Sequence, residues 1–441
     1  MSGASALPTC RCFAAHAPVN PRAISAWQRR GHGAIMEPLP RGASAFAAGT
    51  GSTAHRRAVH CRDEAAGAGA FFPPDFEGVQ HAFSRFHFAR GRRRAGRHRP
   101  PEARMKAAVF RAPGGLERIE IRDVADPGRP GLGQLRVALH ATSLNFHDLI
   151  VAKGGMGTAD GRVLMSDGAG VVEAVGEGVT EFAPGDHVVS LFFPHWADGA
   201  PSTPVGDFAG TPGDGIDGFA TEVVVRAAGA FTHAPRGWRH AESATITTAG
   251  LTAWRALVGD AGLKPGDVVL TLGTGGVSIA ALQIAKASGA TVIVTSSSDE
   301  KLSRASALGA DHTVNYRQTP DWGRVARELT GGRGVDHVIE LGGPGTLAQS
   351  IDAVRVGGHI SLIGVLTGMQ GDVPTAALMG KQARLQGLIV GSRRQQQDYV
   401  AALEATGIRP VIDRSFGFGE LADAFRWQEQ GGHFGKIVVE W

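Results

Sequence analysis

From residue 267 onward, uninterrupted apolar runs alternate with segments whose apolar residues recur at helical spacing. The strand-like runs are "DVVLTLG", "TVIVTS", "HTVNY", "VDHVIELGG" and "HISLIGV". Between them, the spacing predicts helices over 276–288, 299–308, 320–329 and 345–354. Strands that are apolar at nearly every position are buried on both faces, which is typical of a parallel sheet covered by helices on each side. The sequence therefore predicts an α/β fold with a doubly wound parallel sheet.

The preceding part of the chain has a different pattern. Residues 105 to about 228 contain short β-rich stretches separated by Gly, Pro and Asp, which indicates a small barrel-like domain. Residues 241–260 are predicted to form a helix-bearing connector. After the parallel sheet, the tail from about 376 adds a strand-like "LQGLIVG", two helices and a final "KIVVE".

The net charge of +4 averages two unlike parts of the chain. Residues 1–104 contain 16 Arg, no Lys and six acidic residues, whereas 105–441 contain 29 basic and 35 acidic residues. We interpret 1–104 as a disordered Arg/Ala/Gly-rich leader, or as a start assigned upstream of Met105, in preference to an Arg-rich targeting peptide or an arm that binds nucleic acid. We expect a cytoplasmic protein without a membrane span, because no apolar run reaches 18 residues and no secretory signal is present.

The cysteines are confined to the leader. They are Cys10, Cys12 and Cys61, so residues 105–441 offer no thiolate to a metal and no disulfide framework.

The stretch "TLGTGGVSIAALQIAK", residues 271–286, follows a predicted strand and opens a helix within a βαβ unit. Gly273 permits a tight turn, Gly275 lets the backbone approach a pyrophosphate, and the helix N-terminus attracts its charge. Ser278 stands where a third glycine is usual and is small enough for close packing. We therefore predict a Rossmann-type dinucleotide site formed by Gly273, Thr274, Gly275, Gly276 and Val277.

The end of the second strand bears on the choice of dinucleotide. An NAD site usually has an acidic residue here, but the chain has Ser296 in "TSSSDEK". We expect Ser297 and Glu300 to form a capping box at the next helix. Hydroxyls and cations suit a 2′-phosphate, so we predict NADP(H), with NAD(H) as the alternative. The groups available to it are those of Ser296, Ser297, Lys301, Tyr316 and Arg317.

The order of these parts, with "SLNFHDL", "GAGVVEAVGEGV", "ATITTAGLTAW" and "GTGGVS", resembles the medium-chain dehydrogenase/reductase superfamily across 105–441. Within it, the chain is most similar to the zinc-independent, quinone-oxidoreductase-like branch. The resemblance implies a GroES-like catalytic domain at 105–240, a dinucleotide-binding Rossmann domain at 241–375 and a segment, 376–441, that returns to the catalytic domain. It also implies an oxidoreductase with a small-molecule substrate, and a homodimer.

The resemblance identifies the positions at which zinc-dependent members hold their catalytic metal with a Cys, a His-Glu pair and a second Cys. This chain has Asn145 at the first, Ser166 and Asp167 at the pair, and Thr248 at the last. An amide, two hydroxyls and one carboxylate are poor zinc ligands beside thiolate and imidazole. The region that corresponds to the structural-zinc lobe has no cysteine. We therefore expect no zinc at either site.

Without a Lewis acid, hydride transfer depends on positioning and on hydrogen-bond donors near the oxygen that gains charge. A quinone, an enone or a related carbonyl spreads that charge and is the expected acceptor. The expected donors are the Asn145 amide and His147, with His147 preferred because histidine donates a proton readily near pH 7. Thr248 is expected to contact substrate or nicotinamide.

The resemblance further implies a structural ion pair between Asp148 and Lys436. The aromatic residues expected to wall the pocket are Phe146, Phe192, Phe193 and Trp196.

Two other functions are compatible with the same residues. An alcohol dehydrogenase of this fold would recruit a metal through Asp167, His147 and His195. A non-catalytic protein would retain the dinucleotide without turnover.

Overall fold

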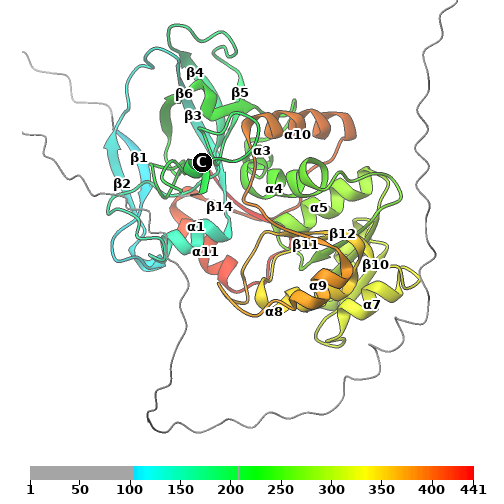
Figure 1. The fold of residues 1–441 in the computed structure, drawn as a ribbon. Helices are drawn as coiled ribbons and strands as arrows, with labels where there is room; N and C mark the ends of the chain where they lie inside the picture. Colours follow the sequence, from blue (N-terminus) through cyan, green and yellow to red (C-terminus); the bar gives the residue numbers. More distant parts are fainter. Residues whose placement is uncertain (1–103, 207) are drawn as a thin grey trace, which may run out of the picture. The chain divides into compact units, whose positions relative to one another are not determined.

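Six parallel strands form one large sheet in the computed structural model, which describes residues 104–206 and 208–441 (Figure 1). Apart from Arg104, the Arg-rich leader lies outside these ranges, so its interpretation stays a prediction. The strands, in order across the sheet, are β10 (His312–Asn315), β9 (Thr291–Ser296), β8 (Val268–Leu272), β11 (Val335–Glu340), β12 (Val354–Leu362) and β13 (Arg384–Gly387). The chain runs outward from β8 in both directions, as in a doubly wound Rossmann sheet. The predicted fold class is confirmed.

Both faces of this sheet are buried, because successive side chains of a strand point to opposite faces. On β8, Val269 packs in one core cluster with Ile279, whereas Leu270 packs in another with Trp322 and Leu347. The helices that follow the strands are α5 (Gly276–Ala287), α6 (Asp299–Ala307), α7 (Trp322–Glu328), α8 (Pro344–Ala353) and α9 (Thr375–Lys381).

One helix cap differs from the sequence expectation. Helix α6 is capped by Ser298, whose hydroxyl accepts from the Lys301 amide at 3.3 Å, and the predicted capping box of Ser297 with Glu300 is wrong. Strand β9 ends at Ser296 and α6 begins at Asp299, as predicted, but the chain bends at Ser297, so Ser298 occupies the N-cap position. In addition, β13 pairs with β12, so the parallel sheet continues past residue 375.

A second, seven-stranded sheet carries the β-rich part of the chain, as the GroES-like resemblance implied. Its strands are β14 (Ile412–Gly417), β15 (Lys436–Glu440), β3 (Gln134–Ser143), β4 (Ala169–Val175), β5 (His187–Ser190), β7 (Phe231–His233) and, paired with β3, β6 (Val223–Ala227). The final strand β15 pairs antiparallel with β3, with Val438 opposite Ser143. The end of the chain therefore lies beside the segment that leads into Asn145.

Smaller elements complete the described fold. A hairpin is formed by β1 (Arg104–Val109) and β2 (Glu120–Ala125). The remaining helices are α1 (Phe146–Ala152), α2 (Thr203–Gly206), α10 (Arg393–Thr406) and α11 (Leu421–Glu429), with 3₁₀ turns at Leu116–Arg118, Ala228–Ala230 and Phe418–Glu420. Within 104–206 and 208–441, none of the helices combines the length and apolar character that crossing a bilayer requires.

The predicted connector forms a helical run that contains two π-helical turns. It consists of α3 (His240–Ala244), a π turn at Ile246–Gly250, α4 (Leu251–Trp254) and a second π turn at Arg255–Asp260. Such turns occur frequently at functional sites. The first one carries Thr248, whose hydroxyl reaches the Asp167 carboxylate.

Candidate active site

Four segments that are distant in sequence converge beside the glycine turn. They are the end of β3 with the start of α1, the loop before β4, the first π turn of the connector, and the start of β15. We call the polar side chains that meet there the Asn145 cluster; it comprises Ser143, Asn145, Asp148, Ser166, Asp167, Thr248 and Lys436. It includes all four residues that stand where zinc-dependent members of the family that the chain resembles have their catalytic metal ligands.

The amide of Asn145 lies at the centre of this cluster and is 8% exposed. Its oxygen accepts a hydrogen bond from Lys436 Nζ at 2.6 Å. An amide nitrogen has only two hydrogens, and both are directed at protein oxygens rather than left for a substrate. The oxygens around Nδ2 are Asp167 Oδ2 (2.9 Å), Asp148 Oδ2 (3.0 Å), Ser143 O (3.3 Å) and Ser166 Oγ (3.5 Å).

Asp167 is the most enclosed member of the cluster, with no exposed surface. Its carboxylate accepts from Ser143 Oγ at 2.5 Å and from Thr248 Oγ1 at 2.6 Å. Burial raises the pKa of Asp167 to about 6, against the opposing attraction of the Lys436 ammonium. Thr248 is only partly buried.

Lys436 has a different partner from the one expected. Its Nζ lies 3.7 Å from Asp167 Oδ2, and it donates to Leu144 O at 2.6 Å as well as to Asn145. Asp148 instead accepts from the backbone amides of Asn145 (3.0 Å) and Ser166 (2.8 Å), because it sits in the first turn of α1. The expected ion pair of Lys436 with Asp148 is thus replaced by one with Asp167. Burial lowers the pKa of Lys436.

His147 points to a separate group of residues. Its ring stacks on Phe208 and meets Phe192 edge-on, with 5.3 Å between ring centroids in each case. Its Nε2 lies 3.7 Å from Asp214 Oδ2. Of the aromatic residues expected to wall a pocket, Phe192, Phe193 and Trp196 are buried in one cluster, whereas Phe146 is 46% exposed.

The glycine turn is tight and leaves open space on one side of its backbone. Gly273 has φ +76°, and a Cβ added at Gly275 would meet no atom within 4 Å, so open space lies beside the backbone there. Ser278 is buried and donates to Leu272 O at 2.7 Å, which packs α5 closely against β8. Gly276 instead has the Lys436 side chain against it, 2.6 Å from an added Cβ. The turn and the Asn145 cluster are therefore in direct contact.

Thr274 and Val277, the other residues of the predicted turn, make structural contacts. The carbonyl of Thr274 accepts from the Gly435 amide at 3.0 Å, and Val277 packs partly buried against the sheet core.

At the end of β9, the groups proposed for a 2′-phosphate come together only in part. Tyr316 is 41% exposed, and its amide donates to Ser296 O at 3.1 Å. Ser297 is partly exposed and next in sequence. Lys301, however, donates to the carbonyl of Gly431 at 2.6 Å, and burial lowers its pKa. The exposed Arg317 side chain makes no hydrogen bond or ion pair with the described part of the chain.

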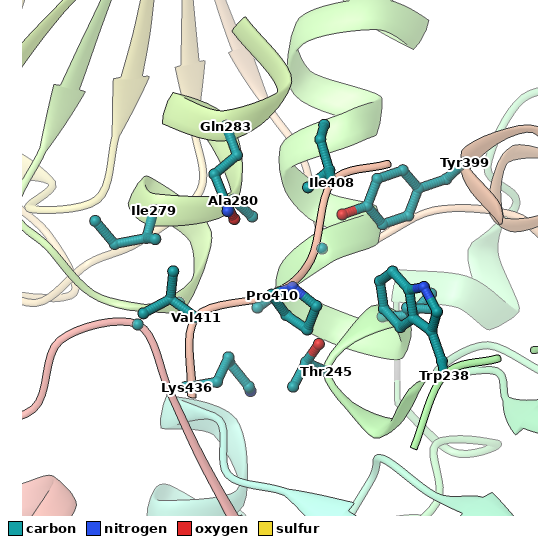
Figure 2. A pocket seen from close by; sticks show the side chains of 15 residues that line it. Trp238, Thr245, Ile279, Ala280, Gln283, Tyr399, Ile408, Pro410, Val411 and Lys436 are labelled. Atoms are coloured by element: carbon teal, nitrogen blue, oxygen red, sulfur yellow. The ribbon is translucent and has the colours of Figure 1, made fainter. Parts of the chain in front are cut away.

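A small cavity lies on the connector side of the turn (Figure 2). In this view, Ile279 and Gln283 of α5 face Pro410 and Val411, with Lys436 nearby. Its volume of about 20 Å³ suffices for one water molecule. This cavity is therefore too small for a coenzyme, and the open space beside the turn lies at Gly275.

Comparisons with known proteins identify the family of both the β-rich part and the parallel-sheet part of the chain. Residues 131–236 match the family described as Alcohol dehydrogenase GroES-like domain, and residues 276–406 match the family described as Zinc-binding dehydrogenase. A Schizosaccharomyces pombe protein named zinc-type alcohol dehydrogenase-like protein C1773.06c is 42% identical over 337 residues, which cover 74% of this chain and 96% of the relative. The chain belongs to the medium-chain dehydrogenase/reductase superfamily.

Solved structures of medium-chain dehydrogenases/reductases show the same fold. One from Sinorhizobium meliloti 1021, provisionally described as an alcohol dehydrogenase, is 42% identical with a TM-score of 0.72, covering 77% of this chain and 98% of its own. An NAD-dependent alcohol dehydrogenase is 37% identical with a TM-score of 0.69, covering 76% and 100%. The crotonyl-CoA carboxylase/reductase AntE, in complex with NADP, is 26% identical with a TM-score of 0.69, covering 77% and 96%. The chain is thus an oxidoreductase, and its fold binds a nicotinamide dinucleotide.

The zinc of many medium-chain dehydrogenases/reductases does not suit this site. Zinc favours thiolate and imidazole, whereas the oxygens of Asp167 already accept from three side chains and Asn145 presents its N–H groups inward. Among residues 104–206 and 208–441, no three His, Cys, Asp or Glu side chains converge as a metal site. The set of Asp167, His147 and His195 considered for an alcohol dehydrogenase is therefore not assembled.

Sequence inspection did not single out Ser143 or Asp214. Ser143 ends a strand and Asp214 lies in a loop, so neither forms a motif with its partners. Their importance depends on contacts 24 and 67 positions away, which no local pattern signals.

Proposed function

We propose that this medium-chain dehydrogenase/reductase is a zinc-independent, NADPH-dependent oxidoreductase that transfers hydride to a quinone, an enone or a related carbonyl. The observation that supports this most directly is the Asn145 cluster. In it, the residues that stand where zinc-dependent relatives have metal ligands form hydrogen bonds with one another. Charge on the acceptor must then be stabilised by delocalisation and by fixed donors, which favours a conjugated acceptor.

The coenzyme assignment is supported by the groups at the two ends of the dinucleotide site. The open backbone at Gly275 and the N-terminus of the 12-residue helix α5 would hold the pyrophosphate. Ser297, Tyr316 and Arg317 would receive the 2′-phosphate, and β9 ends without a carboxylate. When bound, the nicotinamide supplies the hydride.

The proton is assigned to His147, whose imidazole can donate to the oxygen of the reduced acceptor. Thr248 would contact the acceptor or the nicotinamide, with its hydroxyl oriented by Asp167. We assign Asn145 a structural role in place of the expected role as a hydrogen-bond donor to the acceptor. With both N–H groups engaged, it organises the loop around which Asp148, Asp167 and Lys436 assemble.

An alcohol dehydrogenase is the second candidate, because relatives at 42% and 37% identity carry that description. The name of AntE instead describes reduction of crotonyl-CoA, an α,β-unsaturated thioester, with NADP bound. Direct measurement of substrate preference separates the two functions.

The test is a panel of quinones, enones, saturated aldehydes and primary and secondary alcohols, assayed with NADP(H) and NAD(H) in parallel and with the zinc content of each preparation determined. We expect reduction of conjugated acceptors with NADPH at a rate unaffected by a chelator, and loss of turnover in His147→Gln. Alcohol oxidation that rises in proportion to bound zinc would instead establish the second candidate.

A further inference from the structure

The proposed function gives no role to Asp214, whose carboxylate lies beside the imidazole of His147. Asp214, in the loop after α2, is 9% exposed, and its Oδ2 lies 3.7 Å from His147 Nε2. Its other oxygen accepts from the hydroxyl of Thr158, itself 8% exposed, at 3.0 Å. A buried hydroxyl therefore holds one side of the carboxylate and leaves the other directed at the imidazole.

The imidazole is held in a matching orientation. Phe208 stacks on one face of the ring and Phe192 meets it edge-on, which restricts its rotation. Nε2 is enclosed and has no hydrogen-bond partner in the described part of the chain, where the Asp214 carboxylate is the charged group facing it. A closer approach of roughly 0.7 Å brings the pair to an ordinary N–H···O distance. Nδ1 makes no hydrogen bond with the described part of the chain.

We propose that Asp214 is the positioning residue for His147: it accepts a hydrogen bond from Nε2–H and thereby leaves Nδ1 to serve the acceptor. This proposal rests on the proposed function for the role of His147. In the step, the hydride of NADPH brings two electrons to the acceptor carbon, and the Nδ1 proton passes to its oxygen. The products are the reduced acceptor, NADP⁺ and a neutral imidazole protonated on Nε2, which water reprotonates.

A carboxylate in this arrangement selects one tautomer of the ring and stabilises the charged form. An amide in its place can present N–H toward Nε2, which favours the opposite tautomer. It also removes the negative charge that stabilises the imidazolium, the form of the ring that delivers the Nδ1 proton. In a hydrolase with a comparable carboxylate–imidazole pair, that change lowers kcat about 10⁴-fold with the geometry intact. A merely structural Asp214 would change stability without changing the tautomer.

The experiment compares full-length wild type with Asp214→Asn, Asp214→Glu and a matched control, Asp217→Asn. Asp217 lies three residues away in the same loop and pairs with Arg162 at 3.2 Å, with 52% of its side chain exposed. The first readout is the ¹⁵N chemical shifts of His147 in ¹⁵N-histidine-labelled protein, assigned by the signals lost in His147→Gln. The second is kcat and KM with NADPH and the best acceptor of the panel.

We expect Nε2 to be the protonated nitrogen of neutral His147 in the wild type, and to lose that proton to Nδ1 in Asp214→Asn. The same variant should lower kcat at least about 100-fold with KM changed less than about threefold. Asp214→Glu should recover part of the rate, and Asp217→Asn should match the wild type.

An Nδ1-protonated wild type, or an Asp214→Asn variant with unchanged shifts and kcat, would overturn the proposal. If no acceptor is turned over by any form, the proposed function fails, whereas the ¹⁵N shifts still decide the pairing of Asp214 with His147. Thermal melting of each variant identifies any that fails to fold, and Asp214→Glu then provides the comparison.

Discussion

Lys436 Nζ donates to Asn145 Oδ1 at 2.6 Å, joining the last strand of the chain to a loop 291 residues earlier. Because Lys436 also contacts Gly276 at the start of α5, this buried cation connects the loop at Asn145, the Asp167 carboxylate and the glycine turn. Stability and coenzyme binding should therefore depend on the same side chain.

Replacing Lys436 with Met should strongly destabilise the protein. The change leaves the Asp167 carboxylate without its cation and two buried carbonyl oxygens without a donor, and such a loss costs about 3–5 kcal/mol. Urea unfolding measures it. The matched variant is Lys153→Met, because the ion pair of Lys153 with Glu429 is 53% exposed on the lysine side and should be worth less than about 1 kcal/mol. Equal losses in the two variants would contradict this interpretation of the cluster.

Gly275→Ala should separate ligand binding from folding. No atom of the protein lies near the added methyl group, so the free energy of unfolding should change by less than about 1 kcal/mol. The methyl group would occupy the space assigned to the pyrophosphate, so we expect the Kd of NADPH to rise at least about 10-fold, or 1.4 kcal/mol. Fluorescence titration with NADPH measures this.

Two variants serve as references for that titration. Gly419→Ala adds a methyl group with no neighbour within 4 Å but far along the chain from the turn, and it should bind NADPH like the wild type. Gly276→Ala collides with Lys436 and should lose stability as well as affinity. Unchanged affinity in Gly275→Ala would remove the turn from the coenzyme site.

Charge at the end of β9 should set the preference between NADPH and NADH. Ser297→Asp introduces a carboxylate that would repel the 2′-phosphate, and Arg317→Gln removes a cation that has no partner among the described residues. We expect kcat/KM for NADPH to fall at least about 10-fold in each, with a smaller change for NADH. The control is Arg122→Gln, which removes an exposed charge from β2. Parallel losses with both coenzymes would count against a phosphate at this position.

A stack of three imidazoles should make the fold acid-sensitive. His240 lies between His140 and His187, with ring centroids 4.6 and 4.9 Å away, and burial lowers its pKa to about 4. Between its ordinary pKa of 6.5 and about 4, the unfolded chain takes up a proton that the folded chain does not. The folded state therefore loses stability as pH falls through this window.

His240→Phe keeps an aromatic ring in the stack and removes the titration. Urea unfolding at pH 7.0 and 4.5 should show a smaller loss of unfolding free energy than in the wild type. His233→Phe, which replaces a histidine 48% exposed, should retain the wild-type loss. Buried His359, with its pKa also lowered to about 4 by burial, should preserve part of the acid sensitivity in both variants.

Local patterns predicted the elements more reliably than the partners of individual side chains. The strand-to-helix turn at Gly273 and the alternation along β8 follow from contiguous residues, and both occur in the structure as expected. The cap of α6 moved by one residue because three serines in succession offer equivalent hydroxyls, and only the bend of the chain at Ser297 selects Ser298 among them. The family resemblance implied Asp148 as the partner of Lys436, whereas the packed structure pairs Lys436 with Asp167.

By itself, the sequence determined that this chain contains a doubly wound sheet with a glycine turn shaped for a dinucleotide, since periodicity and the steric freedom of glycine belong to short segments. Only the tertiary structure decided that the amide of Asn145 is engaged by Asp167 and Lys436, and that Asp214 stands behind His147. Those relationships depend on how separate strands and loops pack together, and hydrogen bonds between buried groups are specified by that packing rather than by spacing along the chain.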